Sequence, residues 1–69
     1  MNKSNEQVSY EAGEFIANIL EVSHGQLTEN QGSTAIATWG KDAASLGLTE
    51  NQVTAFQAGM DAWFTRESK

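Results

Sequence analysis

Three segments of this 69-residue chain begin with the same helix-start signal. Residues 4–7, 28–31 and 49–52 each read Ser/Thr-x-x-Gln, the pattern of a capping box. In that motif the hydroxyl accepts a hydrogen bond from the third following amide, and the Gln side chain bonds back to the N–H of the capping residue. Gly25 and Gly47 stand where the first two helices should end, because glycine readily adopts the left-handed conformation found there. The sequence therefore predicts three helices joined by short turns.

We expect an all-α three-helix bundle with helices at about residues 5–24, 29–46 and 50–66, in one small helical domain over residues 1–69. A chain of this length buries a low fraction of its surface. It has no cysteine and a single histidine, so we expect no disulfide, no metal site and no cofactor. Tight helix packing and self-association are the remaining sources of stability, and a homodimer is therefore expected.

The spacing of apolar residues predicts which face of each helix is buried. In the first helix these residues recur at three- and four-residue steps, which places them on one face. The second and third helices share one pattern of large apolar residues, with the same steps between members. The expected core residues are Val8, Ala12, Phe15, Ile16, Ile19 and Val22 in the first helix, Ile36, Trp39, Ala43 and Leu46 in the second, and Val53, Phe56, Met60 and Trp63 in the third.

The opposite face of the first helix is expected to be acidic. No Lys or Arg occurs between Ser4 and Gly40, and the whole chain has a net charge of −5. This acidic stripe either binds a basic surface of another protein or is an ordinary solvated helix face. Nucleic acid and membranes are not expected as partners, because phosphate backbones and anionic lipids attract positive charge. The candidate partner-binding residues are Glu6, Tyr10, Glu14, Glu21 and Trp63.

Small residues form a second low-charge stripe on the second and third helices. Such residues let two backbones approach closely, and a glycine inside a helix costs about 1 kcal/mol relative to alanine unless close packing offsets it. The stripes are therefore either a dimer interface or alanines on a solvated helix surface. The candidate dimer-interface residues are Ala37, Gly40, Ala44, Ala55, Gly59 and Ala62.

Residues 43–56 carry the spacing of a helix-turn-helix. The small residue Ala43 is followed four positions later by Gly47, and the aliphatic Val53 comes six positions after that. The segment resembles the helix-turn-helix of response-regulator output domains and sigma-factor C-terminal regions. This resemblance implies a dimeric DNA-binding transcription regulator. The residues that would contact DNA are Thr49, Asn51 and Thr54. The outward positions of the second motif helix lack Lys and Arg, however, and phosphate contacts usually supply much of the affinity for DNA.

Catalysis has few candidate residues in this chain. His24 is the single imidazole, and it falls in the last turn of the first helix, where a cation complements the helix dipole. The glycines are scattered singly, so no phosphate-binding loop is expected. We therefore expect no enzymatic activity and no catalytic residue.

The expected function is protein–protein interaction. No apolar run approaches the roughly 20 residues of a membrane span, and the polar N-terminus does not read as a signal peptide, so a cytoplasmic protein is expected. Small size and an acidic surface fit a regulator, adaptor or inhibitor of bacterial or phage type. The alternative is the helix-turn-helix transcription regulator.

Overall fold

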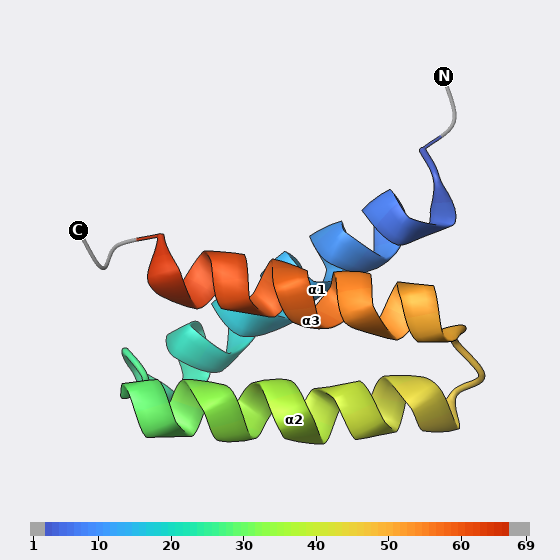
Figure 1. Cartoon of the computed structure of the whole chain (residues 1–69). Coiled ribbons are helices and arrows are strands. Elements are labelled where there is room, and N and C mark those ends of the chain that lie inside the picture. The colour runs from blue at the N-terminus through green and yellow to red at the C-terminus, as the bar shows by residue number, and fades with distance from the viewer. Residues whose placement is uncertain (1–2, 67–69) are drawn as a thin grey trace.

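The computed structural model describes residues 3–66 and contains three α-helices (Figure 1). Helix α1 spans Asn5–His24, α2 spans Glu29–Ser45 and α3 spans Glu50–Thr65. These bounds match the expected ones to within one residue. Over the described range the chain contains no strand, and the prediction of an all-α three-helix fold is confirmed.

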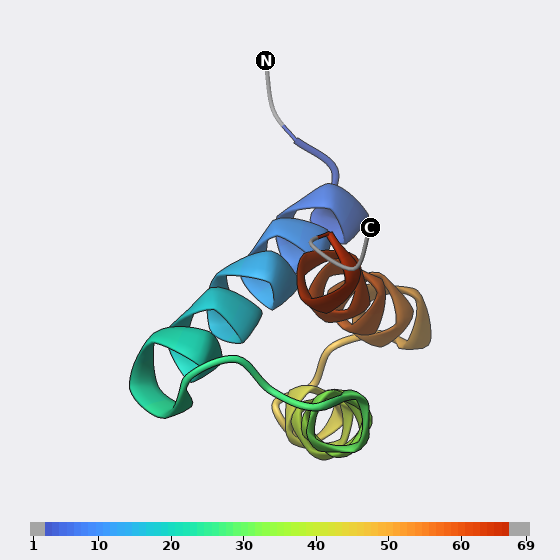
Figure 2. The same ribbon diagram turned by 90° about the vertical axis from the view of Figure 1, so that its left-hand side faces the viewer.

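Helix α3 packs against both of the other helices. In the described part of the chain, no Cα atom of α1 comes within 8 Å of a Cα atom of α2. Helices α2 and α3 run side by side in opposite directions, whereas α1 crosses α3 obliquely (Figures 1 and 2). Helices α1 and α2 therefore diverge from the loop that joins them. None of the three described helices is long and apolar enough to cross a bilayer.

The predicted capping boxes form completely at α2 and α3. The Thr28 hydroxyl accepts a hydrogen bond from the Gln31 amide at 3.2 Å, and the Gln31 side chain accepts one from the Thr28 amide at 2.9 Å. Thr49 and Gln52 form the same reciprocal pair at the start of α3. Two orphan donors are thereby satisfied at each helix start.

The capping box at α1 is only half formed. The Ser4 hydroxyl accepts from the Gln7 amide at 3.1 Å, but the Gln7 side chain donates to Glu11 at 3.5 Å. Lys3 also donates to Glu11, at 2.7 Å, and this hydrogen bond lowers the pKa of the Glu11 carboxyl. The Gln7 side chain is therefore directed along α1 instead of back to its cap.

Both predicted helix-ending glycines have a positive φ, 81° at Gly25 and 94° at Gly47. After α2, the Leu48 amide donates to the Ala43 carbonyl at 3.3 Å and the Gly47 amide donates to the Ala44 carbonyl at 3.1 Å. This pair of bonds is a Schellman motif, which satisfies two carbonyls at the helix end. The turn between α2 and α3 is therefore set by local hydrogen bonds.

Helices α1 and α3 touch through two glycines. A Cβ atom added to Gly13 would overlap the carbonyl oxygen of Phe56, and one added to Gly59 would overlap the carbonyl oxygen of Tyr10. Neither position has room for a side chain, so the two backbones are in direct contact. The buried residues of α1 are accordingly small, and they are Ser9, Gly13 and Ala17.

The predicted buried face of α1 is therefore wrong. Because α3 lies on the small residues, most of the large apolar residues predicted to be buried on α1 are exposed. Phe15 is 63% exposed and Val22 is 80% exposed. Ile16 is the one member of the predicted set that packs against the core. We call the exposed members the outer face of α1, and they are Val8, Ala12, Phe15, Ile19 and Val22.

The hydrophobic core lies on the side of α1 that faces α3, and it is small. Its buried hydrophobic residues in the described range are Ala17, Ala43, Phe56 and Met60. The expectations for α2 and α3 hold better than those for α1. The partly buried residues that pack against the core include Ile36, Trp39, Val53 and Trp63, as predicted. Leu46 departs from the prediction, because it lies at the end of α2 and is 81% exposed.

Candidate functional site

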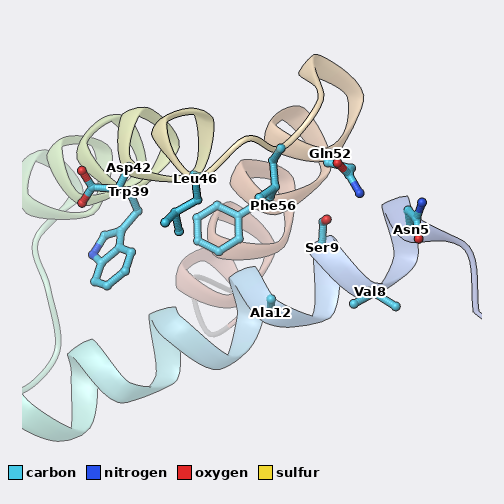
Figure 3. Close-up of a pocket in the computed structure, with 11 residues that line it drawn as sticks. Asn5, Val8, Ser9, Ala12, Trp39, Asp42, Leu46, Gln52 and Phe56 are labelled. Atoms are coloured by element: carbon cyan, nitrogen blue, oxygen red, sulfur yellow. The ribbon is translucent and has the colours of Figure 1, made fainter.

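An apolar groove lies between α1 and α2. One part of it has a volume of about 340 Å³, and α3 forms the floor of this part through Gln52 and Phe56. Figure 3 shows Trp39, Leu46 and Phe56 pointing into this space, with Ser9 and Ala12 on the facing side of α1. We call this feature the α1–α2 groove.

The α1–α2 groove continues toward the loop that joins the two helices. This second part has a volume of about 520 Å³, and its apolar lining includes Leu20 of α1, Leu27 of the loop and Ala35 of α2. Trp39 lines both parts. The groove exists because α1 and α2 diverge without packing on each other.

The chemistry of the α1–α2 groove suits an apolar ligand. Among the described residues that line either part, Asp42 is the one carboxylate, His24 is the one imidazole, and there is no Lys or Arg. Nowhere in residues 3–66 do three His, Cys, Asp or Glu side chains come together as a metal site. Burial of apolar surface is therefore what the groove offers to a ligand.

The acidic stripe predicted on α1 is partly engaged with α3. The Trp63 indole N–H donates to Glu21 Oε1 at 2.9 Å. Arg66 Nη2 lies 3.8 Å from the same oxygen, and the Arg66 guanidinium carbon lies 3.7 Å from the centroid of the Trp63 ring. Although no Lys or Arg occurs between Ser4 and Gly40, α3 therefore brings a base from the end of the described chain next to Glu21. Glu21 and Trp63 connect α1 to α3 within the chain.

The rest of the acidic stripe borders the contact between α1 and α3. Glu6 is exposed and Glu14 is half-buried. Tyr10 is 36% exposed, and its carbonyl oxygen lies against Gly59. The acidic stripe therefore lies near α3. The side of α1 opposite the core is occupied by the outer face instead.

The predicted small-residue stripes do not form one open surface. Gly59 lies against Tyr10, and a Cβ atom on Gly40 would overlap the side chain of Gln57. Gln57 Nε2 also donates to the Ile36 carbonyl at 3.2 Å. Both glycines are therefore used inside the chain. Of the other candidates, Ala37 and Ala44 are exposed, whereas Ala55 and Ala62 are half-buried.

The segment that resembles a helix-turn-helix forms the corner between α2 and α3. Ala43 is buried between the helices, and Gly47 has the expected positive φ. The two helices run nearly antiparallel, however (Figures 1 and 2), whereas the helices of a helix-turn-helix cross at about 90–120°. The corner is thus that of an αα-hairpin. The three candidate DNA contacts, Thr49, Asn51 and Thr54, are exposed near the start of α3.

Sequence reasoning missed both the glycine contact and the groove. A signal for the contact was present, because Ser9, Gly13 and Ala17 follow one another at four-residue steps and so form a small-residue face on α1. No comparable signal marked the α1–α2 groove, since it depends on how far α1 and α2 diverge.

Two features of the described residues are apolar and open to solvent, the α1–α2 groove and the outer face of α1. They meet along Val8 and Ala12, which belong to both. Comparison of the chain with protein-family models, with curated proteins and with solved structures finds no match in any of the three.

Proposed function

We propose that the chain is a non-enzymatic cytoplasmic protein that binds an amphipathic helix of another protein, as a regulator, adaptor or inhibitor. The observation that carries this proposal is the α1–α2 groove. A helix placed in this groove would contact both α1 and α2, which do not contact each other. An amphipathic helix recognised in this way buries apolar anchors from successive turns of one face.

The size of the α1–α2 groove supports a helical ligand. Its two parts, about 340 and 520 Å³, are both lined by Trp39. Each part is large enough for apolar side chains from a ligand. A helix laid along the groove would contact Leu46 toward one end and Leu27 toward the other. The Trp39 indole would lie between these anchors.

The charge of the chain favours a basic partner. Asp42 lines the groove, no Lys or Arg does so among the described residues, and the chain carries a net charge of −5. A helix with an apolar face and Lys or Arg at its edges is therefore complementary. Electrostatic attraction would speed its association at low ionic strength.

A Leu/Lys amphipathic peptide of about 18 residues, or five helical turns, tests this proposal. In a Trp63→Phe variant the fluorescence of Trp39 reports on the groove alone. We expect a saturable blue shift as the peptide covers the indole. Leu46→Glu should weaken binding at least tenfold, because it places a charge among the anchors. The matched control Ala44→Glu adds the same charge on α2 to a residue that does not line the groove.

Attraction between a basic peptide and an acidic protein would not by itself make Leu46→Glu bind more weakly than Ala44→Glu. Leu46→Glu and Ala44→Glu both increase the negative charge, so a purely electrostatic contact would strengthen in both variants. Equal binding by the two variants, or the absence of any fluorescence change, would contradict groove binding.

DNA binding remains the alternative, but the nearly antiparallel course of α2 and α3 gives it no support. A salt-dependent mobility-shift assay on random and genomic DNA tests it directly. We expect no shifted band at low salt, where non-specific phosphate contacts are strongest. A band that weakens steeply with salt would favour the alternative.

We also propose that the chain is a homodimer. A domain with only four buried hydrophobic residues in its described range gains stability by covering apolar surface with a second copy. The groove proposal does not depend on this self-association.

A further inference from the structure

The outer face of α1 is apolar on the side of the helix that faces solvent. Single exposed apolar residues are common on protein surfaces, but continuous apolar patches mark interaction sites. Here Val8 is 52% exposed and Ile19 is 41% exposed, and they continue the row formed by Phe15 and Val22. The row runs along most of α1, over about 21 Å at 1.5 Å per residue.

The spacing of this row is that of a coiled-coil seam. From Val8 to Val22 its members advance by four, three, four and three residues. The mean step of about 3.5 residues keeps a seam facing a partner helix that has the same repeat. A second copy of α1 provides that repeat.

The charges around the outer face favour a second copy over other occupants. Two chains of net charge −5 repel each other unless the contacting surfaces carry few charges. Glu14 and Glu21 lie toward α3, away from the outer face. Glu11, beside the row, is already paired with Lys3 at 2.7 Å. An anionic membrane is a poorer fit, because helices that lie on such membranes carry many Lys and Arg residues on their polar face.

We propose that two copies of this chain pair through the outer face of α1, with the two helices antiparallel about a two-fold axis. This pairing sets Phe15 against Ala12 of the partner subunit and Val8 against the partner's Ile19. Large side chains thereby meet smaller ones, and the helix dipoles oppose each other. A parallel pairing would stack the large Phe15 side chains on each other and leave a gap at the Ala12 layer.

This dimer shares Val8 and Ala12 with the α1–α2 groove and otherwise uses other residues. Phe15, Ile19 and Val22 do not line either part of the groove, and Leu46 is not on the outer face. One helix per subunit is a small interface, at the low end of the range for specific complexes. We therefore expect a dissociation constant in the micromolar range.

Disulfide trapping tests the pairing and its direction, because the chain has no cysteine of its own. Val8→Cys and Ile19→Cys proteins are oxidised separately and as a mixture. We expect a covalent dimer in the mixture, since these two positions face each other. Each variant alone should stay uncoupled, because its own cysteines lie 11 residues, or about 16 Å, apart along the paired helices. A disulfide requires Cα atoms within about 7 Å.

Sedimentation velocity at tens of micromolar tests the surface independently. The wild type should sediment as a dimer and Phe15→Glu as a monomer. The helical circular dichroism spectrum of Phe15→Glu should be unchanged, because Phe15 is 63% exposed in the single chain. Ala37→Glu, on the exposed side of α2, is the matched control and should remain dimeric. Leu46→Glu should also remain dimeric, which separates this surface from the groove.

Three results would overturn the proposal. The first is a wild type that stays monomeric at hundreds of micromolar. The second is dissociation of the Ala37→Glu control while Phe15→Glu remains a dimer. The third is efficient coupling of Val8→Cys with itself, which requires parallel helices.

Discussion

At the scale of single residues, Gly13 and Gly59 determine how α1 sits on α3. Each glycine has a backbone carbonyl of the other helix where its Cβ atom would be. Backbone atoms cannot rotate aside as a side chain does, so a substitution must push the helices apart. The contact therefore fixes which side of α1 faces α3.

Gly13→Ala should destabilise the fold by about 2 kcal/mol, because overpacking a close contact forces backbone shifts. Gly32→Ala is the matched control, since its added Cβ would meet a Phe64 ring carbon at an ordinary 3.4 Å. Alanine is the better helix former, so the control should be neutral or stabilising by up to about 1 kcal/mol. Urea titrations followed by circular dichroism measure both free energies of unfolding. Similar losses in the two variants would show that the glycine contact is not tight.

Glu21, Trp63 and Arg66 form a second contact between α1 and α3. Glu21→Ala removes the acceptor of the Trp63 indole and should cost about 1 kcal/mol of folding free energy. Glu21→Gln keeps an acceptor oxygen and loses only the charge beside Arg66, so a smaller loss is expected. In a Trp39→Phe background, Glu21→Ala should also shift Trp63 emission to the red. Equal stability of Glu21→Ala and the wild type would mean that the indole hydrogen bond contributes nothing.

At the scale of the helices, capping residues set where each element begins. Thr49→Ala should destabilise α3 by about 1 kcal/mol, because an amide loses its acceptor. Thr28→Ala should cost less, because Leu48 precedes the α3 cap and packs against the core, while α2 has Gly32 at the position where a staple partner would stand. Ser4→Ala should cost least, since its box is half formed. Denaturant titration of the three variants gives the order, and a reversed order would contradict the staple.

The helix bounds could be predicted from the sequence because caps act locally. Thr28, Thr49, Gly25 and Gly47 each satisfy hydrogen bonds within a few residues, so their pattern alone locates the ends. The buried face of α1 could not be predicted in the same way. A row of large apolar residues indicates a face that avoids water, but it does not say whether the partner is this chain or another one. On α1 the core takes the small-residue face.

The candidate site was even less accessible to sequence reasoning. Trp39 was expected in the core, and it does pack there, but it also lines the α1–α2 groove. Leu46 continues the apolar period of α2 and nevertheless stands exposed at its end. How far α1 covers Trp39 and Leu46 depends on the angle at which α1 crosses α3. That crossing is set by contacts such as Gly13 with Phe56 and Gly59 with Tyr10, whose members are far apart in the sequence.

At the scale of the whole molecule, the core is small and many apolar side chains of the described residues stay exposed outside it. The α1–α2 groove and the outer face of α1 are both open in the single chain. Covering either one would add stability by mass action, because the folded state alone presents these surfaces. We propose that the first binds a helix of another protein and that the second binds a copy of this chain.

The indole N–H signals of the two tryptophans test groove binding most directly. Trp39 lines the groove, whereas the Trp63 indole donates to Glu21 outside it. On titration of ¹⁵N-labelled protein with the Leu/Lys peptide, the Trp39 indole signal should move progressively and saturate, while the Trp63 signal keeps its position. An unmoved Trp39 signal, or equal movement of both signals, would contradict the proposal that the α1–α2 groove binds a helix.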